Sequence, residues 1–281
     1  MKTPMKSALC LLAGTLLLGL AACNENGRKS QLSQVVWAND GVEVATIVQR
    51  WDETGSNPDG TPIKANLTHQ LYLQKLDGGN KRILSNELPG ADARDFYYIH
   101  SAGYAVASYF EPQADGSTVK RYYQLRLNGG QAYSLTSKPD MAVIPSPDGS
   151  SIARVTLFPS ACTPNGSSSN SDACHVDVEF VNPNDLKVVG SKEKITFSSR
   201  EKLPELTWTP EGKLVATSGS EAFAVKAGET PQSVPVPGCT QPQTSSSQVD
   251  KNGVYVFIDG NSVKSRLEAT MPRFGCQTGN S

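Results

Sequence analysis

The sequence predicts an all-β fold, a β-propeller of about five to six four-stranded blades, from its composition and from two kinds of repeat. Its 281 residues include 24 glycines and 18 prolines and are 19% charged, which argues against a coiled coil or helical bundle and requires frequent turns. A hairpin motif and a turn motif each recur along the chain. Repeated units of this kind bury their apolar faces against their neighbours, so the repeats favour a ring of similar sheets.

The first 22 residues are predicted to be a signal peptide that is cleaved from the mature chain. Lys2 and Lys6 supply a positively charged start, and residues 8–20 form an uncharged, apolar run of 13 residues. At roughly 1.5 Å per residue this run spans about 20 Å, which is shorter than the roughly 30 Å core of a bilayer. It therefore indicates a secretory signal rather than a stable transmembrane helix.

The signal ends in Leu20-Ala21-Ala22-Cys23, which resembles the lipobox of bacterial lipoproteins. The resemblance implies that Cys23 becomes the acylated N-terminus, so that palmitate-type chains anchor the protein in the membrane without a protein helix. Asn24 stands where an aspartate would imply retention in the inner membrane. The resemblance therefore favours the outer membrane, with the protein facing the periplasm, although leaflet and membrane stay open. The alternative is an ordinary secretory signal followed by a chance cysteine.

Residues 23–32 are predicted to form the lipidated N-terminus and a flexible tether, because residues 24–31 contain no apolar side chain. The β-propeller domain is then expected over residues 33–281. Loss of Lys2 and Lys6 with the signal changes the formal net charge from -1 to -3. This balance argues against a nucleic-acid partner, which would require an excess of Lys and Arg.

Four cysteines remain besides Cys23, and an even number in an oxidising compartment predicts two disulfides. They are Cys162, Cys174, Cys239 and Cys276. Three pairings are possible, and Cys162 with Cys174 is favoured because these two bracket a Ser/Asn/Gly-rich loop of eleven residues. Cys239 with Cys276 would then hold the C-terminal region. The spacings are not those of a zinc site, so we expect no metal.

The hairpin motif occurs twice, 51 residues apart, at residues 71–79 and 122–130. Each copy predicts an alternating strand followed by an Asp-Gly or Asn-Gly turn, LDGG in the first copy and LNGG in the second. Such dipeptides supply the positive φ angles that a two-residue type I′ turn requires. A second short strand is expected at residues 84–85 and 135–136.

The turn motif reads as a strand, a Pro-acid-Gly turn and an apolar strand that ends in alanine. Its clearest copies are residues 144–153 and 208–216, with weaker copies at 37–45, 100–107 and 249–256. The turn glycines at 41, 103, 149, 212 and 253 are separated by 62, 46, 63 and 41 residues. The two long intervals contain the polar stretch 53–65 and the Cys162–Cys174 loop. Without these insertions the period is about 45 to 50, the size of a four-stranded blade.

The phrases at 146–153 and 208–212, together with the Leu-Asp-Gly-Gly hairpin, resemble the repeats of TolB-like β-propellers. The resemblance covers most of residues 33–270, but only the copies at 146 and 208 lie near the family pattern. Five copies imply five blades, and a sixth would form if the strand near Val35 and the segment after Gly260 complete another. An unrelated β-sandwich with similar turns is the alternative.

Catalytic motifs are absent from the sequence, which contains no nucleophile elbow, HExxH, P-loop or dinucleotide-binding fingerprint. We therefore assign no catalytic residue and no cofactor. His69 and His100 are expected in packing or turn positions. Strand alternation places His175, Asp177 and Glu179 on one face, but same-face neighbours lie about 7 Å apart and converge poorly on a metal. A solvated strand face explains these three residues as well.

Two further groups of side chains are candidates for a binding surface. Asp92, Arg94 and Asp95 are expected to form a solvated, charged loop. Nine of the chain's 20 aromatic residues lie between residues 96 and 133. Part of this set is expected to pack in the core, and the rest could form a patch for a protein or glycan partner. The candidate patch comprises Tyr97, Tyr98, Tyr104, Tyr109, Tyr122 and Tyr123.

The leading hypothesis is a membrane-anchored envelope lipoprotein whose β-propeller serves as a protein-interaction or scaffold module. The lack of a convergent catalytic constellation favours this over an enzyme. The second hypothesis is a glycan-binding or hydrolytic propeller that acts from its central channel with acids from several blades. The fold cannot choose between them, because propellers serve both kinds of function. The identity of the partner or ligand stays open.

Overall fold

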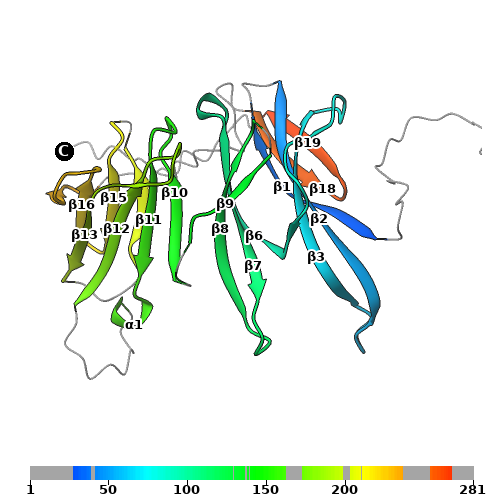
Figure 1. Cartoon of the computed structure of the whole chain (residues 1–281), viewed down its shortest axis with the longest axis horizontal. Coiled ribbons are helices and arrows are strands. Elements are labelled where there is room, and N and C mark those ends of the chain that lie inside the picture. Colours follow the sequence, from blue (N-terminus) through cyan, green and yellow to red (C-terminus); the bar gives the residue numbers. More distant parts are fainter. Residues whose placement is uncertain are drawn as a thin grey trace, which may run out of the picture.

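The chain was analysed as a computed structural model, which describes most of the predicted domain. The described residues are 28–38, 42–128, 130–136, 138, 140–162, 173–198, 203–209, 211–236 and 254–267. They form five successive antiparallel sheets (Figure 1). A 3-10 turn (His100–Ala102) and the four-residue helix α1 (Pro159–Cys162) accompany them. No helix of these ranges is long and apolar enough to span a membrane.

Each sheet is a meander of strands that are consecutive in the sequence. The first sheet contains β1 (Lys29–Trp37), β2 (Glu43–Ser56), β3 (Pro62–Lys75) and β4 (Arg82–Ile83), with β5 (Leu88–Pro89) also paired to β3. The second contains β6 (Ala91–Ile99), β7 (Tyr104–Pro112), β8 (Thr118–Arg126) and β9 (Ala132–Ser134). The third contains β10 (Met141–Pro145), β11 (Ile152–Leu157), β12 (Cys174–Val181) and β13 (Val188–Phe197). The fourth contains β14 (Glu205–Trp208), β15 (Leu214–Ser218), β16 (Glu221–Val225) and β17 (Gln232–Val234). The fifth contains β18 (Val254–Asp259) and β19 (Ser262–Leu267).

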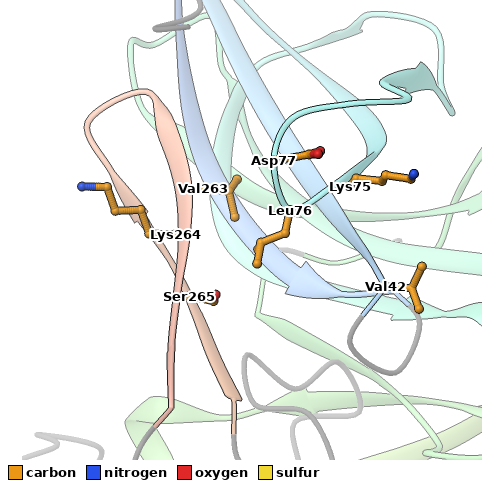
Figure 2. Close-up of a pocket in the computed structure, with 7 residues that line it drawn as sticks. All are labelled: Val42, Lys75, Leu76, Asp77, Val263, Lys264 and Ser265. Carbon is orange, nitrogen blue, oxygen red and sulfur yellow. The ribbon is translucent and has the colours of Figure 1, made fainter. Parts of the chain in front are cut away.

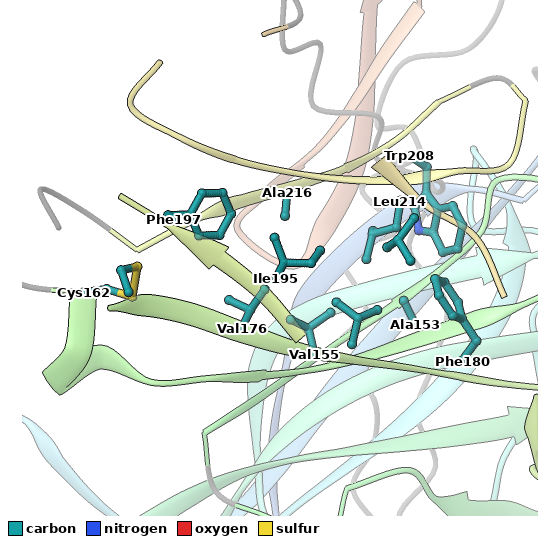
Figure 3. Packing of buried hydrophobic residues seen from close by; sticks show 13 residues of the cluster. Ala153, Val155, Cys162, Val176, Phe180, Ile195, Phe197, Trp208, Leu214 and Ala216 are labelled. Atoms are coloured by element: carbon teal, nitrogen blue, oxygen red, sulfur yellow. A yellow bond between two sulfur atoms is a disulfide. The ribbon is translucent and has the colours of Figure 1, made fainter. Parts of the chain in front are cut away.

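Neighbouring sheets pack face to face through apolar clusters, and this arrangement is that of a β-propeller. One cluster joins the first and second sheets, a second joins the second and third, and a third joins the third and fourth. Figure 3 shows the last of these, in which Phe180 lies beside Trp208 at a ring separation of 6.0 Å, with Leu214 close by. A further cluster joins the fifth sheet to the first through Val44 and Val256.

The predicted all-β propeller is confirmed, with differences between blades. The second, third and fourth sheets have the expected four strands, whereas the first sheet has the additional short strand β5. The fifth sheet consists of two strands in the part of the chain that the structure describes. Five sheets agree with the five copies of the turn motif.

The turn motif marks the same position in the first four sheets, the connection between the first and second strands. The copies at 146 and 208 connect β10 to β11 and β14 to β15, and the weaker copies at 37 and 100 connect β1 to β2 and β6 to β7. In the fifth copy the turn itself lies outside the described residues, and the strand that follows it is β18.

The hairpin motif forms the predicted hairpins, but the expected two-residue turn after β3 is wrong. Five residues, 76–80, separate Lys75 from Lys81, and the positive φ angles belong to Gly78 (83°) and Asn80 (51°). The turn is wider because the Lys75 N–H donates to the Gly79 carbonyl, and the Asp77 carboxylate accepts from the Gly79 N–H at 2.8 Å. The short partner strands begin at residues 82 and 132, slightly earlier than the expected positions 84 and 135.

Ordered structure begins before the expected boundary at residue 33, so the predicted tether is too long. β1 begins at Lys29, which pairs with Trp51 of β2. Backbone pairing needs no apolar side chain, which is why this polar segment forms a strand. The Arg28 guanidinium is also held, by Glu87 at 2.9 Å and by the Thr68 hydroxyl at 3.0 Å.

The two insertions take different forms. Residues 53–65 extend β2 and β3 into a paired hairpin of two 14-residue strands instead of forming a loop. The second insertion is closed by the predicted disulfide between Cys162 and Cys174, whose Cα atoms lie 4.5 Å apart and whose side chains are fully buried in the cluster of Figure 3. Cys239 and Cys276 lie outside the described residues, so their pairing stays a prediction.

Two glycines at equivalent turns test how tightly neighbouring blades are packed. Gly149 and Gly212 have nearly the same φ angles, 72° and 74°. A Cβ at Gly149 would lie 2.4 Å from Ala102 Cβ, in the 3-10 turn after β6, and 2.7 Å from Ile99 Cγ2 at the end of β6, whereas a Cβ at Gly212 meets no described atom within 4 Å. The matched alanine variants therefore share backbone strain and differ in a steric clash between sheets.

We expect Gly149→Ala to lower the free energy of unfolding by about 2–4 kcal/mol and Gly212→Ala by about 1 kcal/mol. Equilibrium denaturation in urea, followed by tryptophan fluorescence, measures both values. Equal losses in the two variants would show that the turn at Gly149 is not packed against the second sheet.

Candidate functional site

The first candidate site is a groove between the first and fifth sheets, with a cavity volume of about 530 Å³, which we call the hairpin groove (Figure 2). It is lined by Val42, Lys75, Leu76, Asp77, Val263, Lys264 and Ser265. The residues come from the turn before β2, the end of β3 with its turn, and β19. The groove thus joins segments from the two ends of the domain.

The hairpin β18–β19 is positioned for this groove by its packing on β1. The Trp37 indole N–H donates to the Val254 carbonyl at 2.9 Å, and Val256 is fully buried against Trp37 and Val44. Val263 packs at the edge of the same cluster and so reaches the groove from the hairpin side.

The hairpin groove combines an apolar floor with cationic flanks. Val42 is 60% exposed, and Leu76 and Val263 are half-buried. Figure 2 shows Lys75 and Lys264 on opposite sides of Leu76 and Val263. Asp77 is engaged within its own turn by the Gly79 N–H. Among the described residues Lys75 has no ion-pair partner, so the groove offers apolar contact together with a positive charge.

β19 adds a strand edge to the groove. Within the described ranges it is hydrogen-bonded to β18 alone, and residues 264–267 are exposed. An exposed strand edge can accept another extended segment through backbone hydrogen bonds.

The second candidate site is a cavity of about 350 Å³ between the first and second sheets, which we call the polar pocket. It is lined by Gln31, Leu32, Ser33, Gln34, Gln49, Lys64, Asp92 and Arg94. These side chains come from β1, β2, β3 and β6. Seven of the eight are polar or charged, in contrast to the floor of the hairpin groove.

Two strand irregularities open the polar pocket. The pairing of β1 with β2 shifts register between Leu32 and Gln34, and the pairing of β6 with β7 shifts between Asp92 and Phe96. Such bulges redirect side chains and are common beside functional sites. In the β6 bulge Arg94 has a φ of 73°, a left-handed conformation that is strained for a residue other than glycine.

Hydrogen bonds hold Asp92 and its bulge in place. Both Asp92 carboxylate oxygens lie 3.1 Å from Gln34 Nε2, and one of them accepts from the Arg94 backbone N–H at 3.0 Å. Lys64 Nζ lies 3.9 Å from the centre of the Trp51 ring. The pocket therefore presents one engaged carboxylate, two cationic side chains and several amides.

A buried histidine lies behind the pocket. His69 Nδ1 is 3.1 Å from the Gly90 carbonyl and Nε2 is 2.9 Å from the Tyr123 hydroxyl. Because a carbonyl only accepts, Nδ1 carries the proton and Nε2 accepts from the tyrosine. Burial lowers the pKa of His69 and raises that of Tyr123. The expectation that His69 is a packing residue is confirmed, since it lies inside β3 and is neutral.

The predicted tyrosine patch is wrong for four of its six members. Tyr98, Tyr104, Tyr122 and Tyr123 are buried, because the second sheet is covered on both faces. Strand alternation therefore sends Tyr98 and Tyr123 into the cluster with the first sheet, and Tyr104 and Tyr122 into the cluster with the third. The hydroxyl groups of Tyr104, Tyr122 and Tyr123 have internal partners, such as the Gly149 carbonyl, 3.2 Å from the Tyr104 hydroxyl.

The other two tyrosines, Tyr97 and Tyr109, are half-buried at the margins of these clusters. Burial together with the Asp95 charge raises the pKa of Tyr97. The six side chains therefore do not form one exposed surface.

The charged group on β6 is not a loop, as the sequence predicted, but part of a bulged strand. It is also divided between two environments. Asp92 and Arg94 line the polar pocket, whereas Asp95 forms an ion pair with Lys120 at 2.6 Å and accepts a hydrogen bond from the Tyr122 hydroxyl.

The other charged candidates lie on β12. One face of this strand carries His175, Asp177 and Glu179 as predicted. All three are half-buried, and the two acids form ion pairs with Lys192 and Arg154 of neighbouring strands. The structure describes no group of three His, Cys, Asp or Glu side chains that could hold a metal ion.

Sequence reasoning missed both cavities. Gln31 was placed in the tether, and Gln34, Gln49 and Lys64 were not singled out. An available signal was the concentration of amides at the start of β1. The sequence contains no comparable signal for the hairpin groove, because Val42 and Val263, which line it together, are distant in sequence. Cys23 lies outside the described residues, and its lipidation stays a prediction.

Comparison with known proteins finds distant structural likenesses and no family. No protein-family model matches the chain, and no curated protein matches it. A solved structure of the acylaminoacyl peptidase of Pyrococcus horikoshii is similar at a TM-score of 0.45 and 8% identity, covering 82% of this chain and 34% of that one. The β-propeller domain of the Trilobed protease from Pyrococcus furiosus, described as having an open velcro topology, gives 0.44 and 8%, with 81% and 60% covered. The chain thus spans about a third and three-fifths of these proteins, and the likeness concerns the fold alone.

The buried His69 predicts a pH dependence of stability. Its pKa in the folded protein lies below the ordinary value of 6.5, so the unfolded chain binds the proton first as the pH falls. The contribution to stability is therefore complete above about pH 6.5 and is lost as the pH falls towards the pKa of the folded state. We expect His69→Gln to be less stable than wild type at pH 7.5 but to lose less stability between pH 7.5 and 5.5.

Urea denaturation at both pH values measures this difference. His100→Gln, which changes an exposed histidine, should keep the wild-type pH profile. An unchanged profile in His69→Gln would contradict the assignment of a neutral His69.

Proposed function

We propose that the protein is a membrane-anchored lipoprotein of the bacterial cell envelope whose β-propeller serves as a protein-interaction module. The anchoring rests on the lipobox ending at Cys23 and on the apolar run that precedes it. The resemblance, with Asn24 after the cysteine, favours the outer membrane with the propeller facing the periplasm. The interaction role rests on the hairpin groove.

The hairpin groove carries this proposal because it exposes apolar side chains beside a strand edge. Val42 and Leu76 offer contact area on one side, and β19 offers backbone groups on the other. Lys75 favours a partner with negative charge, whereas Lys264 already forms an ion pair with Asp259. The chemistry fits an extended segment of an envelope protein that carries an acidic residue next to an apolar one and adds to β19 as a further strand.

A second candidate function is favoured by the polar pocket. Amide side chains together with charged groups in a concave site are suited to hydroxyl-rich ligands, because each amide both donates and accepts. This supports the glycan-binding hypothesis, with the ligand held at the junction of two blades rather than in the central channel.

Lipid anchoring predicts the chemical state of the mature N-terminus. We expect the purified membrane form to begin at Cys23 and to carry a diacylglyceryl group, and we expect Cys23→Ala to leave the precursor unprocessed. Intact mass spectrometry and tandem sequencing of the N-terminal peptide measure both. An unmodified Cys23, or cleavage at another position, would contradict the anchor.

The hairpin groove predicts a site-specific contact in the native envelope. A photo-crosslinking amino acid at Ser265 should capture a protein partner, and Val42→Glu should reduce the yield several-fold by placing a negative charge on the apolar floor. Val188→Glu is the matched control, since Val188 is a 46% exposed valine on the third sheet. Immunoblotting of the crosslinked product measures the yield.

Two results would contradict a partner in the groove. One is capture that is equally strong from a crosslinker placed at Val188. The other is a yield that Val42→Glu leaves unchanged although the variant is abundant and folded.

A further inference from the structure

We infer that the polar pocket binds a sugar acid, a hydroxyl-rich ligand that carries one carboxylate. The inference rests on the glycan-binding candidate of the proposed function and adds the charge class of the ligand. Two kinds of observation support it. Some lining side chains already form hydrogen bonds with protein groups, and others have polar atoms that remain available to a ligand.

The charge balance of the pocket favours a monoanion. Asp92 is engaged by Gln34 and by the Arg94 backbone N–H, so its negative charge is already solvated by protein groups. Lys64 and Arg94 are exposed and have no ion-pair partner among the residues that the structure describes. The lining therefore carries two cations and one acid, which leaves one positive charge for the ligand.

Arg94 is suited to the carboxylate end of the ligand. Its guanidinium presents parallel N–H donors that match the two oxygens of a carboxylate. The left-handed backbone at φ 73° directs this side chain from the β6 bulge, and the bond to Asp92 holds the bulge in that conformation. Strain retained in this way is typical of residues placed for binding.

Two amides are suited to the hydroxyl groups. Gln31 and Gln49 are direct cross-strand partners on β1 and β2, and both line the pocket. Directly opposite side chains have Cβ atoms about 5 Å apart, so neighbouring hydroxyls of one sugar ring can reach both amides. Each amide supplies a donor and an acceptor, which matches the dual character of a hydroxyl group.

The remaining features limit the size and position of the ligand. A volume of about 350 Å³ lies at the lower end of the range of small-molecule sites, roughly 300–1,000 Å³. Lys64 is positioned over the Trp51 ring, so its ammonium group lies on a buried, rigid platform. Because the lining side chains stand on paired strands, the site is formed before the ligand arrives.

Isothermal titration calorimetry of the detergent-solubilised full-length protein tests the inference, with D-glucuronate, D-glucose and inorganic phosphate as probes. We expect glucuronate to bind about tenfold or more tightly than glucose, and salt to weaken it, because the ion pairs are partly exposed. Phosphate should neither match glucuronate nor displace it at equal concentration.

Two variants and a control separate binding from folding. Arg94→Gly removes the guanidinium but relieves the strained backbone, so glucuronate affinity should fall about tenfold while stability is kept or rises. Lys64→Gln should weaken glucuronate but not glucose. Lys187→Gln, a change at an 81% exposed lysine on the third sheet, should leave all affinities unchanged.

The possible results test the charge class of the ligand separately from the glycan-binding function. Equal binding of glucose and glucuronate would overturn the charge class and keep the glycan site. Phosphate that binds as tightly as glucuronate would show a general anion site, and unchanged affinity in Arg94→Gly would remove the assigned role of that residue. The absence of heat with any probe would overturn both the inference and the glycan-binding candidate, while the hairpin groove is tested separately by crosslinking.

Discussion

The packing of the hairpin β18–β19 on the first sheet is the contact on which both ends of the domain depend. A two-stranded hairpin is marginally stable alone in water, so its apolar face must be covered. Val256 supplies the buried contact, and the Trp37 indole fixes the position by donating to the Val254 carbonyl across 217 sequence positions. The same contact covers Val35 and Val44 of the first sheet. The hairpin groove exists only while this packing holds, since its walls belong to the two packed elements.

In this propeller, the register of strand pairing determines whether the seam between two sheets is apolar or polar. Where strands pair in a continuous register, the seams between sheets are apolar, as along β7 and β8 of the second sheet with the buried Tyr122 and Tyr123. Where β1 and β6 shift register, the seam opens and polar side chains enter. The polar pocket lies close to a buried polar pair, since His69, which is hydrogen-bonded to Tyr123, is the cross-strand partner of Gln49 in the pocket lining.

The fold was predictable from local signals, and the sites were not. The Pro-acid-Gly turns at 146 and 208 indicate strand connections whatever surrounds them, because Gly149 and Gly212 supply backbone angles that other residues resist. The cysteine pair at 162 and 174 was predictable from spacing for a similar reason. Whether Tyr122 or Tyr123 is exposed depends on the neighbouring sheets, which alternation along one strand cannot indicate. The β6 bulge depends on hydrogen bonds between side chains and backbone, such as that of Asp92, and the hairpin groove depends on contacts between distant segments.

With the proposed lipid on Cys23, the contacts of Arg28 would limit how far the propeller can move from the membrane. Glu87 and Thr68 hold this side chain five residues after Cys23. Since an extended chain advances by at most about 3.6 Å per residue, a lipid on Cys23 would keep the first sheet within roughly 18 Å of the headgroups. Encounters with partners in the same membrane then become a two-dimensional search, in which confinement to a thin layer raises the effective concentration without any additional contact. So short a linker between the lipid and the first sheet would favour partners that lie in or close to the bilayer over those that diffuse freely in the periplasm.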